Sequence, residues 1–372
     1  MPLKVLCGIG TRPEAIKMAP VIHALKANID IDCRVFVTAQ HRSMLDQVLK
    51  VFDIEPDIDL NIMLPNQFLT TLTARLLLGM DDVLLAEQPD IVLAQGDTTT
   101  VMTIAMTCFY HRIPFGHIEA GLRTGNLSNP FPEEMNRVIA GRLARWHFAP
   151  TESARQNLLK EGVSDKDIVL SGNTVIDALQ SVINQPLKIG VNLDDKKRLI
   201  LVTVHRRENF DKPIKEICKA LITLIENNHD IQILLPVHQN PNVKDTIYEK
   251  LGGHPRILLC PPLDYLPFVG AMKQAYIILS DSGGVQEEAP ALGKPLLVLR
   301  QETERPENVD ANIAKLVGSD YKKIVREAQR LLDDPLAYQE MAKNISLYGD
   351  GKAANRIVKT LVNSISRDKS IK

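Results

Sequence analysis

The sequence predicts an α/β protein of two doubly wound units, each a parallel sheet covered by helices on both faces. Short β-branched and apolar runs alternate with helix-length amphipathic stretches almost throughout. The 372 residues are too many for one ordinary core. A polar, poorly periodic segment at 184–198 separates the two halves. We therefore expect domains at 1–175 and 176–352, with a last helix from about residue 353 that packs back on the first domain and a tail reaching 372.

Strands and helices alternate from the start of each half. In the first half we expect strands at 5–8, 34–38, 91–94, 115–118 and 147–149, and helices at 13–26, 43–52, 69–87, 98–110 and 133–144. In the second half we expect strands at 199–203, 231–235, 257–259, 275–279 and 295–299. Ligands of such sheets bind beyond the carboxyl ends of the strands, so two units that face each other would form one cleft. Polar residues that follow strands are therefore the candidates for function.

Composition narrows the class of protein. The net charge is −1, from 44 basic and 45 acidic side chains, which gives no overall field to attract nucleic acid or an anionic membrane. The first residues lack the features of a signal peptide, and no apolar run reaches the roughly 18 residues of a membrane span. The five cysteines have no paired spacing and lie mostly in apolar runs. We expect a cytoplasmic protein with reduced cysteines and no metal site.

The loop after the first strand has a glycine pattern that superficially matches a dinucleotide fingerprint. Its third glycine position holds Pro13, and the second strand ends at Thr38 rather than at an acid, so a nicotinamide cofactor is not expected. Thr11 and Glu14 instead form a capping box. A cation such as Arg12 is disfavoured at a helix N-terminus, which suggests a bound phosphate there; the alternative is a solvated surface arginine.

Carboxylates follow the next strands of the first half. Asp97 precedes a Thr-rich helix start, where it could serve only as an N-cap. Glu119 ends a strand and enters a glycine-containing loop. Glu133 and Glu134 begin a helix; Glu134 fits a role at the helix dipole at least as well as a catalytic one. Two such carboxyl groups could act as general acid and general base if burial raised one pKa.

The second half carries the segment Asp281-Ser282-Gly283-Gly284-Val285-Gln286-Glu287-Glu288 between a strand and a helix. Two glycines allow close approach of a ligand, and the helix N-terminus suits a diphosphate. Glutamates one turn into the helix could accept hydrogen bonds from hydroxyl groups. The alternative is a turn without a ligand. His205 and Arg206 also follow a strand, as does His238, and Arg305 could reach the same place.

These segments together closely resemble the non-hydrolysing UDP-N-acetylglucosamine 2-epimerases, in order across nearly the whole chain. The matching segments are Gly10 to Lys17, Thr38 to Arg42, Gly96 to Thr100, His117 to Thr124, His205 to Glu208, Asp281 to Pro290 and Thr303 to Glu307. The resemblance implies a glycosyltransferase-B architecture, no metal or nicotinamide, and a homodimer. It also implies interconversion of UDP-N-acetylglucosamine and UDP-N-acetylmannosamine by inversion at C2, through loss and re-addition of UDP.

The resemblance assigns roles to single positions. The candidate catalytic residues are Asp97, Glu119, Glu133 and His205. The positions that match UDP contacts are Arg12, Lys17, Phe268, Ser282, Gly283, Gly284, Glu288 and Arg305. A second, allosteric UDP-N-acetylglucosamine site is matched by Gln40, Gln67, Glu133, Arg206 and His238.

The chain departs from the family pattern at a few positions. Gln95 replaces a usual histidine, Val204 a usual small residue, and Asn312-Ile313 a usual Gly-Thr. Three rival functions remain at this point: a glycosyltransferase of the same architecture, a hydrolysing 2-epimerase, and a catalytically silent nucleotide-sugar sensor. The presence of all the candidate acids and of His205 favours an enzyme.

Overall fold

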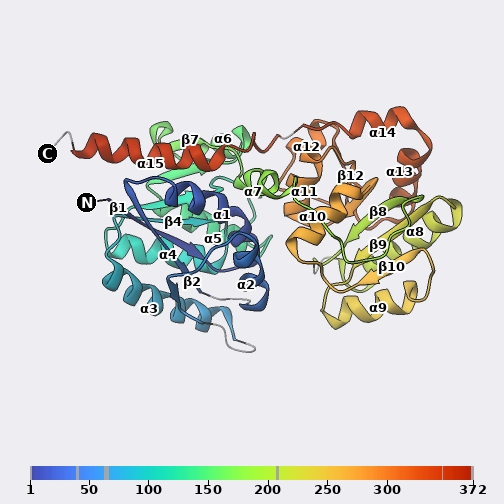
Figure 1. Ribbon diagram of the computed structural model, residues 1–372, viewed down its shortest axis with the longest axis horizontal. Helices are drawn as coiled ribbons and strands as arrows, with labels where there is room; N and C mark the ends of the chain where they lie inside the picture. The colour runs from blue at the N-terminus through green and yellow to red at the C-terminus, as the bar shows by residue number, and fades with distance from the viewer. Residues whose placement is uncertain (1, 39–41, 63–66, 207–208, 346, 370–372) are drawn as a thin grey trace. The chain divides into compact units, whose positions relative to one another are not determined.

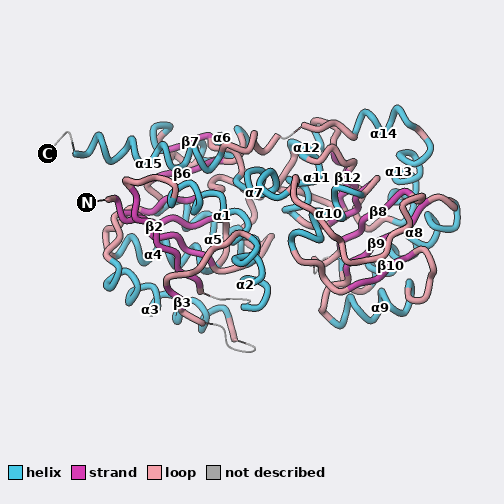
Figure 2. The backbone as a smooth tube through the Cα atoms, in the orientation of Figure 1, coloured by secondary structure: helices cyan, strands magenta, loops and turns pink. Residues whose placement is uncertain are grey.

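The computed structural model describes residues 2–38, 42–62, 67–206, 209–345 and 347–369. The chain divides into two compact units, residues 1–181 with 348–372, and residues 182–347. Each unit holds a sheet with helices around it (Figures 1 and 2). The first unit extends past the boundary expected at residue 175 because most of helix α7 (Thr174–Val182) belongs to it.

The first unit is built on a parallel sheet in the order β3-β2-β1-β4-β5-β6-β7. Its strands are β1 (Leu3–Ile9), β2 (Ile31–Val37), β3 (Ile58–Asp59), β4 (Ile91–Gln95), β5 (Phe115–Ile118), β6 (Trp146–Ala149) and β7 (Ile168–Leu170). The order reverses between β1 and β4, which is the switch point where loops diverge and ligands bind in such sheets. β4 is buried at every position, as a central strand covered on both faces should be.

Helices cover this sheet and include the end of the chain. They are α1 (Arg12–Lys26), α2 (Arg42–Val51), α3 (Leu69–Glu87), α4 (Thr99–Tyr110), α5 (Glu133–Leu143), α6 (Glu152–Lys160), α7 and α15 (Ala353–Lys369), with a short 3₁₀ turn at Asp165–Asp167. α15 packs against α1, and Figure 1 shows it in red along the first unit. The Asp177 carboxylate fixes its start by accepting hydrogen bonds from the backbone N–H groups of Ala353 and Ala354.

The second unit repeats the arrangement, with a parallel sheet in the order β10-β9-β8-β11-β12-β13. Its strands are β8 (Arg198–Thr203), β9 (Ile231–Pro236), β10 (Ile257–Cys260), β11 (Ile277–Ser280), β12 (Leu296–Val298) and β13 (Ala314–Leu316). Its helices are α8 (Lys212–Asn227), α9 (Pro241–Leu251), α10 (Tyr265–Gln274), α11 (Gly283–Ala291), α12 (Glu307–Asp310), α13 (Tyr321–Asp333) and α14 (Pro335–Met341). The switch point lies between β8 and β11.

The predicted α/β class and the two doubly wound sheets are confirmed, and every expected strand is present. The sequence missed the short strands β3, β7 and β13, which have two or three residues and lie at the sheet edges. Such segments carry too few residues for a periodic signal. All five cysteines are free, and Cys33 is half-buried while the others are buried. Within the described residues, no helix has both the length and the apolar character needed to cross a bilayer.

Candidate functional site

Glu119 is the centre of the polar groups at the carboxyl edge of the first sheet. It follows β5, and only 7 % of its side chain is exposed. Its Oε1 pairs with the Lys17 ammonium from α1 and accepts a 2.7 Å hydrogen bond from Asn173 Nδ2, while its Oε2 accepts a hydrogen bond from Gln95 Nε2 at the end of β4. The predicted residues Lys17, in α1, and Glu119, after β5, are therefore brought together, and Gln95 and Asn173 add two further contacts to the carboxylate.

The start of α1 is organised by the buried carboxyl group of Glu14. Its Oε2 accepts hydrogen bonds from the backbone N–H groups of Gly10 and Thr11, which confirms the predicted capping box. Burial raises the pKa of Glu14 to about 7, and the nearby charge of Asp97 acts in the same direction. Arg12 is the first residue of α1 and is half-buried. Its contact with phosphate stays a prediction.

Asp97 forms an ion pair rather than a helix cap. Its Oδ2 accepts a 2.5 Å hydrogen bond from Arg137 Nη2, and its backbone carbonyl accepts one from Asn136 Nδ2. The cap of α4 is Thr98, whose hydroxyl accepts a hydrogen bond from the Val101 N–H. The alternative that Asp97 serves only as the N-cap is therefore wrong, because the next residue offers its hydroxyl in the better position.

The two glutamates that begin α5 have different surroundings. Glu134 is buried, and its Oε1 accepts hydrogen bonds from the N–H groups of Thr124 and Gly125, at 2.9 and 3.0 Å. Its Oε2 lies 3.1 Å from Arg137 Nη1. Glu134 therefore holds the loop after β5 in shape. Glu133 is half-buried, and its catalytic role stays a prediction.

His117 on β5 is fully buried, and its Nε2 lies 2.7 Å from the Gly96 carbonyl oxygen. Burial lowers its pKa from 6.5 to about 3, so the native state holds a neutral ring.

The low pKa of His117 makes the free energy of unfolding depend on pH. The unfolded chain takes up a proton on this residue near pH 6.5 and the folded chain does not, so the unfolding free energy falls as pH drops below that value. Between about pH 7 and about pH 5, wild type should lose roughly 2 kcal/mol more unfolding free energy than His117→Gln, measured by urea denaturation. Equal losses would contradict this.

Gly121 fixes the loop that follows Glu119. Its φ is +93°, and an added Cβ would lie 2.3 Å from the carbonyl oxygen of Ala154. Gly121→Ala should therefore lower the unfolding free energy by about 3 kcal/mol, from backbone strain and a clash with rigid backbone. Gly125 is the matched control, because its φ is +77° but its Cβ would meet nothing within 4 Å. Gly125→Ala should cost only about 1 kcal/mol in the same urea titration.

In the second unit, the carboxylate of Asp281 organises the loop after β8. Asp281 follows β11 and is fully buried. It accepts hydrogen bonds from the N–H groups of His205 and Arg206 and from Asn209 Nδ2, and lies 2.8 Å from His205 Nδ1. Burial alone would raise the pKa of Asp281, but these donors together lower it. The ring of His205 is thereby oriented with its Nδ1 on a carboxylate, while 43 % of the side chain is exposed.

The helix start at Ser282 lies beside Arg305. Ser282 is the N-cap position of α11, and an added Cβ on Gly283 would lie 2.9 Å from Arg305 Nη1. Arg305 also pairs with Glu287 and Glu304, each at 2.6 Å. The predicted residues Ser282, Gly283 and Arg305 therefore lie together, and Gly283 is small where the guanidinium group approaches the helix.

The other predicted UDP contacts of this unit lie on α10 and α11. Glu288 is buried, and its Oε1 accepts a 3.0 Å hydrogen bond from the hydroxyl of Tyr265. Phe268 lies on α10 and is half-buried, and Gly284 is in the first turn of α11. Their contact with UDP stays a prediction.

The positions matched to a second site are described only in part. Gln40 lies outside the described residues. Gln67 is half-buried just before α3. The rings of His205 and His238 have centroids 6.3 Å apart, and burial together with the charge of His205 lowers the pKa of His238. Arg206 Nη2 lies 3.7 Å from Glu304 Oε1.

The residues that depart from the family pattern differ in their contacts, burial and backbone conformation. Gln95 contacts Glu119 directly. Val204 is buried in the core of the second unit. Asn312 has a φ of +57°, a conformation that asparagine adopts more readily than most residues other than glycine, and Ile313 is fully buried.

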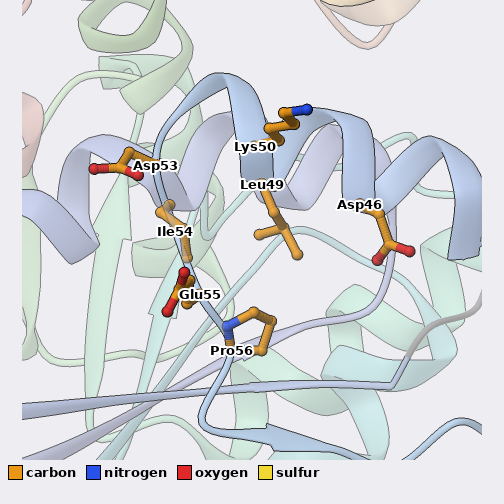
Figure 3. A pocket seen from close by; sticks show the side chains of 7 residues that line it. All are labelled: Asp46, Leu49, Lys50, Asp53, Ile54, Glu55 and Pro56. Atoms are coloured by element: carbon orange, nitrogen blue, oxygen red, sulfur yellow. The ribbon is translucent and has the colours of Figure 1, made fainter.

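A surface pocket of about 280 Å³ lies away from these groups, between α2 and the chain that leads to β3. It is lined by Asp46, Leu49, Lys50, Asp53, Ile54, Glu55 and Pro56. Figure 3 shows that its three carboxylates point in different directions, and it contains no predicted site residue.

Several residues around the site were not singled out from the sequence. They are Asn173, Arg137, Tyr265 and Asp281 as the partner of His205. Asn173 follows β7, so recognition of that short strand would have placed it among the residues at the carboxyl edge. For Arg137 and Tyr265 no local signal distinguishes them from ordinary helix residues.

Comparisons with known proteins agree with this arrangement. The family model described as UDP-N-acetylglucosamine 2-epimerase matches residues 23–362. The chain is 52 % identical to the UDP-N-acetylglucosamine 2-epimerase of Escherichia coli K12, over 97 % of this chain and 99 % of that one.

Solved structures extend the agreement to three dimensions. The Neisseria meningitidis UDP-GlcNAc 2-epimerase, bound to UDP-GlcNAc, is 46 % identical with a TM-score of 0.93, covering 97 % of this chain and all of that one. The Methanocaldococcus jannaschii enzyme, in complex with UDP-GlcNAc and UDP, is 33 % identical with a TM-score of 0.83 over 97 % and 100 % of the two chains. From its sequence, its fold and these similarities, the chain belongs to the UDP-N-acetylglucosamine 2-epimerase family.

Proposed function

We propose that this protein interconverts UDP-N-acetylglucosamine and UDP-N-acetylmannosamine by inversion at C2, without releasing the free sugar. The observation that carries the proposal is the buried Lys17–Glu119 pair, with Asp97 on the neighbouring loop, in a chain similar over its length to 2-epimerases. The relative from Neisseria is bound to UDP-GlcNAc, which supports the same nucleotide sugar as substrate here. The product would supply a polysaccharide pathway.

The second unit is suited to bind the nucleotide end. The N-terminal turn of α11 offers N–H groups and a partial positive charge to a pyrophosphate, and Arg305 lies against Gly283 in that turn. Glu287 and Glu304 hold the guanidinium group in place. The buried Glu288 would accept hydrogen bonds from ribose hydroxyls, and Phe268 would pack beside the nucleotide.

The chemistry at C2 requires more than proton abstraction. The C2 proton is scarcely acidic because it is not next to a carbonyl group. Breaking the C1–O bond while the C2–H bond breaks gives a 1,2-glycal, UDP and one proton on a protein base. UDP then adds back at C1 while a proton is delivered to the opposite face of C2. Asp97, Glu119, Glu133 and His205 would supply these proton transfers, and Arg12 and Lys17 would stabilise the departing diphosphate.

A second nucleotide-sugar site would regulate turnover. Gln40, Gln67, Glu133, Arg206 and His238 match its pattern in the family, and the relative from Methanocaldococcus was solved with both UDP-GlcNAc and UDP. Initial rates measured against UDP-N-acetylglucosamine concentration should then follow a sigmoidal curve. A hyperbolic curve would remove the second site from the proposal.

We also propose that the protein is a homodimer, as the family resemblance implies. The packed helices α3 and α4 carry exposed apolar side chains, which are Leu78, Leu85, Phe109 and Tyr110. Such a group is a candidate for burial between subunits. Light scattering should give twice the 41.5 kDa of one chain, and a single-chain mass would contradict the dimer.

One experiment separates the proposed activity from its rivals. Purified protein is incubated with UDP-N-acetylglucosamine in heavy water, and the products are analysed by NMR and mass spectrometry. Deuterium at C2 of a sugar still attached to UDP supports the proposed epimerase. Free N-acetylmannosamine would identify a hydrolysing enzyme, and binding without exchange would identify a sensor.

A further inference from the structure

The backbone of Glu119 is held in an unusual conformation at the end of β5. Its φ is +65°, a region that residues with a Cβ rarely adopt. Such conformations persist only where surrounding contacts hold them, and they concentrate at functional sites. The contacts of the side chain therefore identify which residues hold Glu119 in place.

Both carboxylate oxygens of Glu119 accept from donors on separate segments. Lys17 comes from α1, Gln95 from the end of β4, and Asn173 from the loop before α7. The orientation of the Asn173 amide is fixed independently, because its Oδ1 accepts a 3.1 Å hydrogen bond from the Val175 N–H. Its Nδ2 must therefore face Glu119. Gln95 is buried, and its Nε2 donates to Glu119 Oε2.

This set of donors favours one protonation state. A protonated carboxyl group must donate its O–H to an acceptor, whereas an ionised one only accepts. The ammonium of Lys17 and the two amide N–H groups are all donors, so a proton on either oxygen of Glu119 would compete with them. Hydrogen bonds to the charged form and a nearby cation both stabilise it.

We propose that Gln95 and Asn173 are positioning residues that hold the Glu119 side chain in one orientation and keep it ionised. Another group is then the proton donor. This inference rests on the proposed epimerase function. It leaves the acid role to another of the candidate residues. It also gives a purpose to Gln95, a neutral amide that donates to Glu119 without titrating near neutral pH.

Other charged and titratable groups at this edge of the sheet already have partners or a defined state. Asp97 pairs with Arg137, and Arg123 pairs with Glu161. His117 is neutral, and Glu14 accepts from the backbone of the loop after β1. Because burial raises the pKa of Glu14 to about 7, a shift in the pH profile is assigned to Glu119 only where both the Gln95 and the Asn173 variants show it.

Two nearly isosteric variants test the proposal. Gln95→Glu and Asn173→Asp each replace a donor by a carboxylate, and Asn173→Asp keeps the oxygen that accepts from Val175. The acidic limb of the kcat–pH profile should move up by one pH unit or more, and kcat at neutral pH should fall about tenfold or further.

Circular dichroism shows whether each variant folds. If Gln95→Glu does not fold, Gln95→Met, which adds no charge, tests the loss of the same hydrogen-bond donor. Gln95→Met should move the acidic limb in the same direction by a smaller amount. Folded variants whose kcat–pH profiles superimpose on wild type would overturn the inference. The heavy-water assay on wild type tests the epimerase function separately, so deuterium at C2 combined with unchanged variant profiles would reject this inference alone.

Discussion

Replacing Glu119 by glutamine should lower kcat by about three orders of magnitude. The substitution removes the charge that faces Lys17 and places a new amide against the donors of Gln95 and Asn173. Because the nucleotide is proposed to bind through the second unit, KM should change much less than kcat. Steady-state kinetics of UDP-N-acetylglucosamine turnover measure both quantities.

The matched control for this variant is Glu152→Gln. Glu152 lies on α6 of the same unit, pairs with Arg155, and is 55 % exposed. Exposed ion pairs contribute little, so this variant should keep wild-type kcat. A Glu119→Gln enzyme with kcat within tenfold of wild type would show that the carboxylate is structural only.

Asp281→Asn should have the second largest effect, with kcat reduced about 10²- to 10³-fold. Asparagine can present only one oxygen, and its amide N–H groups would face the N–H donors of His205 and Arg206 that the carboxylate now accepts from. The ring of His205 would lose its fixed orientation, as in other sites where a buried carboxylate orients a catalytic histidine. Stability should also fall by about 2–3 kcal/mol, because buried donors lose their acceptor.

Asp230→Asn is the control for this second variant. Asp230 pairs with Arg198 in the same unit and is 57 % exposed, so activity and stability should both stay close to wild type. Urea denaturation and kinetics on the same preparations separate the two effects. If Asp281→Asn were destabilised but turned over at the wild-type rate, His205 would not need this carboxylate.

Local sequence was sufficient for most of the fold. β4 and β11 are predictable because buried central strands are continuous apolar runs, and the capping box of Thr11 and Glu14 involves residues only three apart. Local sequence does not decide which of two neighbouring residues takes one position, as with Asp97 and Thr98 at the start of α4. Short edge strands such as β7 also lack a local signal.

The sequence by itself determined the two α/β units, the strand ends that carry polar residues, and the resemblance to the epimerases. Only the tertiary structure decided which of those residues meet. Asn173 and Glu119 are 54 residues apart, and His205 and Asp281 are 76 apart. The order of the strands brings each pair to one edge of a sheet. Side-chain contacts of this kind depend on which strands are neighbours and in what register, which no local pattern of residues encodes.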